Sequence, residues 1–456
     1  MSKEEIDLIR NHPKKAINKL MVPIIISCFV EAFNSIIDSV WVSGLGSDAL
    51  TALGFVSPLF VGLVGIGIGL GIGINSVISR RVGKKDLDDA NNAAIHSILL
   101  SIILSVIITA VIMLFLKEIL IALGAGIVLS EATDYAFYIF LGTYALLIPS
   151  MLSGILMAEG AVKKATYPLI AAALINIVLD PIFIYVLNLG ISGAAIATVL
   201  AQTIAIAIMA YWLFIKGNTL FEYKMEKYKR NLKIYKEILL IGIPAGLEEV
   251  ALAVLCIVVN ILLLEVSNPD SVAAFAVAWR IISLGVVPAI GVGSASVTVA
   301  GVAYGARNYK NLNITTNYAT VVGTIISLGI FIVLNLFSNQ IAIIFAYSDS
   351  SSYLAPLISH VIRISSFYLL PAALGDVATY VFQGMGKGIT SFILIVNREV
   401  VTSLIFVYIV GIILNFGADG IYVGLTIGSF VGSLMAFVYN KYYIKRLEKI
   451  SKKLSI

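Results

Sequence analysis

The sequence predicts an all-α integral membrane protein, with twelve transmembrane helices in two pseudo-symmetric six-helix bundles around a central cavity. Of its 456 residues, 59% are hydrophobic and 12% are charged, whereas a soluble protein is about 25% charged. The apolar residues gather into stretches of roughly 20 residues, the length that crosses a bilayer as a helix. The second half of the chain also repeats motifs of the first half. Together these features predict a membrane protein built by duplication.

Twelve apolar stretches follow one another, and polar connectors separate them. Each is long enough to be one membrane-spanning helix. In chain order they are residues 20–42, 53–78, 93–116, 132–157, 167–187, 193–215, 237–264, 272–303, 313–336, 353–382, 389–413 and 419–440. The polar start of the chain has no signal-peptide pattern, so we expect insertion to begin with the first span.

The basic residues predict the orientation of these spans. Most of the 31 Lys and Arg residues lie at the N-terminus and in alternate connectors such as "SRRVGKKD", "AVKKA" and "ARNYK", and in the tail "NKYYIKRLEKISKK". The opposite connectors, such as "GLGSDAL" and "VSNPD", contain little beyond Lys117. Because basic loops stay in the cytoplasm, both termini are predicted to be cytoplasmic in a multi-pass protein of the cell membrane.

An internal repeat predicts two lobes. "VGKKD" after the second span matches "YGARN" after the eighth, and "LNLGISGAAIATVLAQ" matches "LNFGADGIYVGLTIGS". The longest polar connector falls between the halves, which gives an N-terminal lobe (1–215), a cytoplasmic linker (216–236) and a C-terminal lobe (237–456). Parallel repeats that enclose a cavity are a transporter architecture, whereas an enzyme or a receptor gives no physical reason for the duplication.

Other features argue against soluble functions. The net charge of +5 is concentrated in connectors, so it indicates topology rather than nucleic-acid binding. Cys28 and Cys256 lie far apart in apolar runs and predict neither a disulfide framework nor a thiolate metal site. The run "GIGIGLGIGIN" follows no strand, so it does not indicate a nucleotide loop. Its glycines fall on two helix faces (65, 69 and 73; 67 and 71) and predict close helix packing.

Two intramembrane acids carry the main functional prediction. Asp38 and Asp180 each end an Asn-x-x-x-Asp pattern that begins at Asn34 and Asn176. A charge in hydrocarbon costs about 3 kcal/mol, so each acid needs a partner or an aqueous cavity. Residues four apart share a helix face, so each helix presents an amide and a carboxylate together. Such oxygens suit a hard cation or a proton; a hydrogen-bonded helix contact without function remains the alternative.

Further polar side chains are candidates for lining the cavity. Asn34 begins the first Asn-Asp pattern and Glu31 lies near it, and Tyr135 and Tyr138 lie on the fourth span. Asp376 lies in the middle of the tenth span, where either a functional acid or a structural pair with an arginine is consistent with the sequence. The candidate arginine partners are Arg280, Arg363 and Arg398.

At this point a family resemblance becomes specific. "NSIIDSVWVSGLGSDALTALG", "AEGAVKKATYPL", "NIVLDPIFIYVLNLGISGAAIAT" and "YGARN" resemble the multidrug and toxic compound extrusion (MATE) family. This family lies within the superfamily of multidrug, oligosaccharidyl-lipid and polysaccharide exporters. The resemblance covers essentially the whole chain. It implies an antiporter that is not an enzyme, in which inward sodium or proton movement drives export of cationic or amphipathic organic compounds by alternating access.

The resemblance also implies a site. Asp38, Asn176, Asp180 and Thr198 match the N-lobe cluster that the DinF-like branch uses for cation coupling, and they would ligate the metal if the ion is sodium. The NorM-like branch instead has an acid deeper in the seventh span. Here Ala251 and Leu252 occupy those positions, while the acids are the earlier pair at 248 and 249. This departure favours the DinF-like mechanism.

The resemblance further implies the partners of the chain. We expect no cofactor besides the coupling ion, small organic cations or amphipathic drugs as substrates, contact with membrane lipid, no nucleic acid, and a monomer. A flippase for lipid-linked precursors or a polysaccharide exporter of the same superfamily is the alternative, and an ion channel or a scaffold is a third class. The sequence leaves the substrate and the choice between sodium and protons open.

Overall fold

The computed structural model describes residues 3–217, 219–221, 223, 228–346 and 352–454. Within these ranges all regular elements are helices and no strand occurs. Eleven helices are long and apolar enough to cross a membrane, and a twelfth span results if one bent pair counts as a span. That pair, Ala125–Leu141 and Thr143–Ala158, is bent by 41° and matches the predicted span 132–157. The predicted all-helical membrane fold is confirmed.

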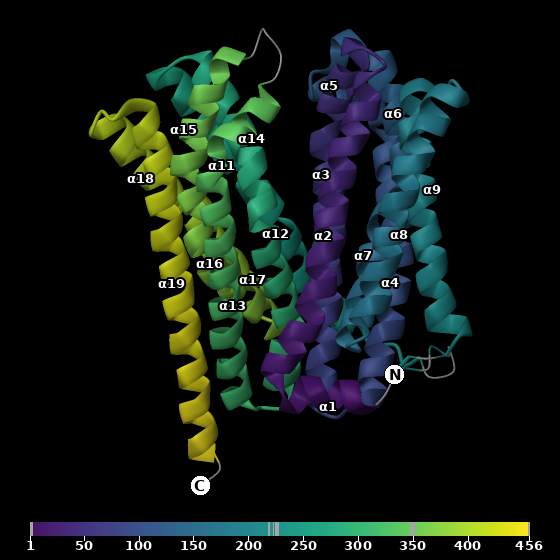
Figure 1. Cartoon of the computed structure of the whole chain (residues 1–456). Helices are drawn as coiled ribbons and strands as arrows, with labels where there is room; N and C mark the ends of the chain where they lie inside the picture. Colours follow the sequence, from purple (N-terminus) through teal and green to yellow (C-terminus); the bar gives the residue numbers. More distant parts are fainter. Residues whose placement is uncertain (1–2, 218, 222, 224–227, 347–351, 455–456) are drawn as a thin grey trace. The chain divides into compact units, whose positions relative to one another are not determined.

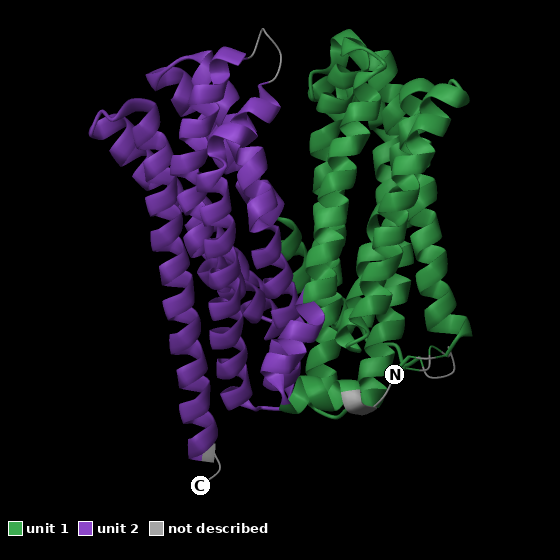
Figure 2. Ribbon diagram, viewed as in Figure 1, with its two compact units in different colours: residues 1–11, 22–247 green, residues 12–21, 248–456 purple. Residues whose placement is uncertain are grey.

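The helices form two compact units, which Figure 2 shows in green and purple. Unit 1 comprises residues 1–11 and 22–247, while residues 12–21, which include the first turns of α2, group with unit 2. Figure 1 labels most helices of unit 1. They are α1 (Lys3–Asn11), α2 (Pro13–Ser43), α3 (Ser47–Gly83), α4 (Leu87–Leu114), α5 (Leu116–Ala122), η1 (Ala125–Val128), α6 (Leu129–Leu141), α7 (Thr143–Ala158), α8 (Val162–Pro181), η2 (Ile182–Val186), α9 (Gly190–Ala210), η3 (Tyr211–Ile215) and α10 (Leu232–Gly246).

Unit 2 contains the remaining helices and its own apolar core, in which Phe275 stacks on the buried ring of Tyr422. Its last helix, α19, ends next to the C-terminus (Figure 1). The elements are α11 (Glu248–Val266), α12 (Pro269–Gly305), α13 (Tyr309–Leu336), α14 (Ser338–Phe345), η5 (Ser352–Leu354), α15 (Ala355–Ser365), η6 (Ser366–Tyr368), α16 (Leu369–Gly384), α17 (Gly388–Val396), η7 (Asn397–Thr402), α18 (Ser403–Val407), η8 (Tyr408–Ile413) and α19 (Gly417–Leu454).

The contact between α3 and α10 sets the end of unit 1. A Cβ atom added to Gly69 of α3 would lie 2.3 Å from the carbonyl oxygen of Gly242 in α10. On the other face of α3, a Cβ atom on Gly71 would lie 2.4 Å from the carbonyl oxygen of Ser150 in α7. Both predicted glycine faces therefore support close backbone packing. Because α10 packs on α3, the compact units divide after Leu247, whereas the predicted lobes divide at residues 216–236.

The predicted repeat recurs in the backbone. Lys85 in "VGKKD" and Arg307 in "YGARN" both have left-handed backbones, with φ of 66° and 54°. The next residues, Asp86 and Asn308, both cap the helix that follows by accepting a hydrogen bond from a backbone N–H three residues on. The asparagines in "LNLG" and "LNFG" likewise have φ of 53° and 58°. A left-handed backbone is uncommon for residues other than glycine, so these shared conformations support the duplication.

The predicted linker is anchored to unit 1 through Glu159, which follows α7. Its carboxylate accepts hydrogen bonds from the backbone N–H of Leu220 (3.2 Å) and the hydroxyl of Tyr223 (2.6 Å). Glu159 is fully buried. Burial raises the pKa of this carboxyl group to about 7, although the two hydrogen bonds act in the opposite direction. Linker residues 218, 222 and 224–227 lie outside the described residues.

A second anchor lies at the end of the linker. The side chain of Asn92 in α4 accepts a hydrogen bond from the backbone N–H of Lys229 and donates one to its carbonyl oxygen. One turn further along α4, Nε2 of His96 accepts the backbone N–H of Asn231 at 3.0 Å. The described part of the predicted cytoplasmic linker is therefore bonded to unit 1 at two points.

Candidate functional site

The two Asn-Asp patterns each form the helix contact that their spacing predicts. In α2, Nδ2 of Asn34 donates to Oδ2 of Asp38 at 3.1 Å. In α8, Nδ2 of Asn176 donates to Oδ1 of Asp180 at 2.9 Å. Both contacts join residues four apart, which lie above one another on one helix face. The helices α2 and α8 of unit 1 therefore each present an amide and a carboxylate together on one face.

The two groups also meet each other. Nδ2 of Asn34 donates a second hydrogen bond, 2.9 Å long, to Oδ1 of Asn176, and this bond joins α2 to α8. The carboxyl groups of Asp38 and Asp180 lie within hydrogen-bonding reach of one another. These four residues (Asn34, Asp38, Asn176 and Asp180) are called the Asn–Asp cluster below. The structure thus brings together three of the four predicted coupling residues.

Two residues of the Asn–Asp cluster are buried, and Asn34 and Asp38 are partly exposed. Asp180 is 1% exposed and Asn176 is 3% exposed. The second carboxylate oxygens, Oδ1 of Asp38 and Oδ2 of Asp180, are buried and have no hydrogen-bond partner among the described residues. Two adjacent carboxylates repel each other when both are ionised. The pair therefore calls for a shared proton or a cation.

Thr198 and Tyr135 differ in their relation to the cluster. The hydroxyl of Thr198 donates to the carbonyl oxygen of Ala194 in its own helix, α9, at 3.0 Å. Among the described residues, the hydroxyl of Thr198 makes this hydrogen bond and makes none to the Asn–Asp cluster. Tyr135 on α6 is buried and lies close enough to Asp38 and Asp180 to interact with their charges.

The other two cavity candidates of unit 1 stand apart from the cluster. Glu31 is exposed on α2 and accepts a hydrogen bond from the hydroxyl of Ser27 at 3.2 Å. Tyr138 is 40% exposed, and its ring packs edge-on against Phe137. Neither side chain is hydrogen-bonded to the Asn–Asp cluster in the part of the chain that the structure describes, so their cavity role remains a prediction.

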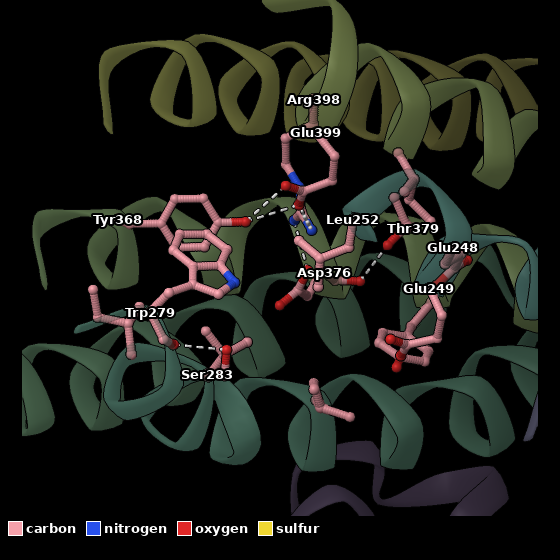
Figure 3. A pocket seen from close by; sticks show the side chains of 15 residues that line it. Glu248, Glu249, Leu252, Trp279, Ser283, Tyr368, Asp376, Thr379, Arg398 and Glu399 are labelled. Atoms are coloured by element: carbon pink, nitrogen blue, oxygen red, sulfur yellow. Dashed lines mark hydrogen bonds and ion pairs between the residues drawn. The ribbon is translucent and has the colours of Figure 1, made fainter. Parts of the chain in front are cut away.

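Unit 2 contains a pocket of about 300 Å³, shown in Figure 3. Within it, Nη1 of Arg398 lies 2.6 Å from Oδ1 of Asp376, and Nε of Arg398 lies 2.7 Å from Oε1 of Glu399. Glu399 also accepts a hydrogen bond from the hydroxyl of Tyr368 at 2.8 Å. All four side chains are buried. The structural pair with an arginine that the sequence allowed for Asp376 therefore exists, and Arg398 is its partner.

The same pocket has more acidic groups than basic ones. Glu248 and Glu249 line it together with the two acids that contact Arg398, so the lining contains four carboxyl groups and one guanidinium. Glu248 accepts a hydrogen bond from Nε2 of Gln383 at 2.5 Å. Sequence reasoning missed Glu399, although an acid directly after Arg398 within an apolar run could have indicated it.

The donor types of the Asn–Asp cluster limit the ions that it suits. Among the described residues, no three His, Cys, Asp or Glu side chains gather in a way that could hold a metal ion. Two carboxylates with two amides are hard oxygen donors without nitrogen or sulfur ligands. Such donors suit hard cations rather than transition metals.

Comparisons with known proteins agree on one family. The chain matches the MatE family model over residues 23–182 and 244–416. It is 23% identical to the multidrug export protein MepA of Staphylococcus aureus, over 93% of this chain and 92% of that protein. The fold is similar to an outward-facing multidrug resistance MATE family transporter of the MOP superfamily, with a TM-score of 0.95, 34% identity, and 98% and 100% coverage of the two chains. A MOP superfamily transporter from Pyrococcus furiosus gives a TM-score of 0.93, 33% identity, and 98% and 99% coverage.

Proposed function

Because this chain belongs to the MATE family of multidrug efflux transporters, we propose that it exports cationic or amphipathic organic compounds across the cell membrane in exchange for sodium ions or protons. Its relatives include multidrug export proteins, which supports a drug-like substrate. The exchange proceeds by alternating access in a monomer embedded in lipid, with both termini in the cytoplasm. The coupling ion is the one small component that the protein needs besides its substrate.

The contact between Asp38 and Asp180 is the observation that carries this proposal. Two carboxyl groups within hydrogen-bonding reach, each with a buried oxygen, are unfavourable unless a positive charge lies between them. Such a pair releases or accepts a cation when its surroundings change, which is the chemistry of coupling. A purely structural contact needs no second acid.

The coupling site in this proposal comprises Asp38, Asn176, Asp180 and Thr198. The buried oxygens Oδ1 of Asp38 and Oδ2 of Asp180, which have no hydrogen-bond partner among the described residues, fit either a proton or a sodium ion. A bound ion would supply positive charge between the carboxylates. Thr198 contributes a hydroxyl oxygen, which still has acceptor capacity while its proton goes to Ala194.

The cluster links the ion to helix packing. Asn34 and Asp38 lie on α2, whereas Asn176 and Asp180 lie on α8. Any change of charge between the acids therefore changes the force that holds α2 to α8. A shift of α2 would alter the cavity wall that the substrate meets, and that shift couples ion movement to export.

The flippase alternative is less consistent with the arginines. A carrier of lipid-linked pyrophosphate needs free basic groups to bind phosphate. Arg398 is held by Asp376 and Glu399 inside the pocket of unit 2. Nε of Arg363 donates to the hydroxyl of Ser338. Two of the three candidate arginines are thus bonded to other side chains, so multidrug export is the better-supported function.

Export from proteoliposomes tests the proposal. Purified protein is reconstituted, and efflux of a fluorescent organic cation such as ethidium is followed under independently imposed sodium and pH gradients. The wild type should export the dye with at least one of the two gradients. Asp38→Asn and Asp180→Asn should bind dye but fall at least about tenfold in gradient-driven export, since each keeps its side-chain volume and loses its charge. Export at the native rate in both variants would overturn the assigned site.

A further inference from the structure

The ring of His96 has a partner at each nitrogen. Nδ1 lies 2.8 Å from the carbonyl oxygen of Asn92, one turn earlier in α4, and Nε2 lies 3.0 Å from the backbone nitrogen of Asn231. A carbonyl oxygen can only accept a hydrogen bond, and a backbone N–H can only donate one. Nδ1 therefore carries the proton and Nε2 offers its lone pair, which makes the imidazole neutral in this arrangement.

Uptake of a second proton would break the contact with Asn231. An imidazolium donates from both ring nitrogens, so its Nε2–H would face the N–H of Asn231 and neither group could accept. His96 is fully buried, and its ring packs on the rings of Tyr228 and Tyr235, with centroids 4.7 and 5.0 Å away. These contacts hold the orientation of the imidazole, so it cannot turn to a new acceptor unless the linker comes away.

The groups that surround the imidazole do not favour its charged form. The two phenols are the titratable groups in contact with it. Phenols ordinarily lose their proton near about pH 10, outside the range of about pH 5 to 8 in which histidine ordinarily changes its charge. Like charges repel, so cations beside the ring disfavour an imidazolium. Three cations flank Asn231 in the chain: Lys229, Arg230 and Lys233.

No charged side chain of the neighbouring helices pairs with His96 in the part of the chain that the structure describes. The helices that pack on α4 are α3, α6, α7 and α10. Arg80 and Arg81 of α3 both pair with Glu237 of α10, and Arg81 also pairs with Asp89 of α4. The sequence of α7 contains no charged residue. The acids of α6 lie in its first two turns, which follow the opposite end of α4 in the chain.

The internal repeat places a tyrosine where unit 1 has His96. Tyr318 of α13 follows His96 at the same separation as Arg307 follows Lys85. The hydroxyl of Tyr318 is hydrogen-bonded to the side chain of Asn18, in the first turns of α2. Both positions therefore hold the start of a helix, and of the two side chains the histidine is the one whose charge changes near neutral pH.

We propose that His96 is a pH sensor: while neutral it holds Asn231, the residue that caps α10, against α4, and acidification at the linker releases this end of the helix. α10 is the last helix of unit 1 before the chain enters unit 2 at Glu248. The released state binds one proton more than the closed state, so closure is favoured at high pH and is lost as pH falls. The proposal goes beyond export, because it needs neither the coupling ion nor the exported compound.

Hydrogen exchange at the backbone amide of Asn231 tests the proposal. Purified full-length protein in detergent is compared at pH 8 and pH 5.5, and mass spectrometry with fragmentation resolves single amides after correction for intrinsic rates. A free imidazole ordinarily takes up its second proton near about pH 6.5, so opening in the wild type should be about tenfold more frequent at pH 5.5 than at pH 8. The amide of Leu220, which Glu159 holds, is the internal reference and should not open more at pH 5.5.

Two substitutions of His96 separate its role as an acceptor from its change of charge. His96→Gln supplies an amide oxygen that can accept the N–H of Asn231 and cannot ionise, so corrected exchange should differ less than about twofold between the two pH values. His96→Phe keeps a ring beside the tyrosines without an acceptor, so exchange should be fast at both pH values. His360→Gln removes an exposed histidine of unit 2; it is the matched control and should keep the wild-type response.

Several outcomes would overturn the proposal. These are equal exchange of Asn231 at both pH values in the wild type, the same pH response in His96→Gln, or exchange in His96→Phe as slow as in the wild type at pH 8. A parallel acceleration at Leu220 would show a general loosening of the linker and would also overturn it. Size-exclusion profiles identify misfolded variants, and the wild-type comparison of Asn231 with Leu220 keeps the proposal testable without them.

Discussion

Arg398 reaches Asp376 across 2.6 Å inside unit 2, and both residues are less than 10% exposed. Breaking a buried ion pair from one side is costly because the other charge stays behind. Glu399 still contacts the guanidinium when Asp376 is replaced, so part of the interaction survives. Substitution of Asp376 can therefore distinguish a structural role from a role in transport.

We expect Asp376→Asn to destabilise the protein by about 2 kcal/mol, because a buried guanidinium loses one of its two carboxylate partners. Thermal unfolding in detergent and the yield of monodisperse protein measure this effect. Glu249→Gln is the matched control, since Glu249 lines the same pocket without contacting Arg398 in the described hydrogen bonds and ion pairs. Normal stability with reduced export in Asp376→Asn would instead assign Asp376 a transport role.

Gly69→Ala should destabilise unit 1 by about 2 kcal/mol, within the range of overpacked cores. The added methyl group would lie 2.3 Å from backbone atoms of Gly242 and Gly246, which cannot rotate away. Gly62→Ala on the same helix is the control, because nothing lies within 4 Å of its added Cβ atom. Thermal unfolding of both variants tests the prediction. Equal stability of the two would show that α3 and α10 are not in close contact.

The docking of the linker on Glu159 should weaken as pH rises. Burial raises the pKa of this group from 4.5 to about 7, so the docked state favours the protonated form. That contribution is fully present below about pH 4.5 and is lost as pH rises through 7. Hydrogen exchange at Leu220, corrected for intrinsic rates, should therefore show more frequent opening at pH 8 than at pH 6.

Glu159→Gln provides the control for this pH effect. Glutamine cannot ionise, so the corrected exchange at Leu220 should become independent of pH between 6 and 8. Its amide oxygen can still accept the hydroxyl of Tyr223. The same pH dependence in Glu159→Gln and the wild type would assign the effect to another group.

Both termini should face the cytoplasm. Single cysteines at Lys15 and Lys449, in a chain whose Cys28 and Cys256 are replaced by serine, should resist an impermeant thiol reagent in intact cells and react after permeabilisation. A cysteine at Ser267, in a connector predicted to face outward, should react in intact cells. Labelling of Lys15→Cys from outside would reverse the predicted orientation.

The parts of the site that depend on one helix were predictable from the sequence. The contacts of Asn34 with Asp38 and of Asn176 with Asp180 follow from helical periodicity alone. The bond between Asn34 and Asn176 joins residues that are 142 apart in sequence, and periodicity says nothing about which helices become neighbours. For the same reason, the family pattern placed Thr198 with the acids, while the structure shows its hydroxyl bonded to its own helix.

The fold shows the same contrast between features of one helix, which the sequence predicts, and contacts between helices, which it does not. Hydropathy identified the spans because a bilayer fixes the length of an apolar helix, and the bent pair of α6 and α7 was still recognisable as one span. The spacing of the glycines predicted two packing faces on α3, but it did not predict which helices contact those faces. That α10 covers one face and α7 the other depends on tertiary packing, which also moved the end of unit 1 to Leu247.

The glycine contact between α3 and α10 also bears on how the chain is made. The ribosome must complete α4 to α9 before α10 exists. The face of α3 that contains Gly69 therefore has no packing partner until α10 has been synthesised. A fragment that ends in the linker would lack α10 and leave that face of α3 unpacked. A fragment that continues through Leu247 includes α10, which packs against it. Two co-expressed pieces divided after Leu247 should therefore assemble into a working protein more readily than pieces divided at residue 216.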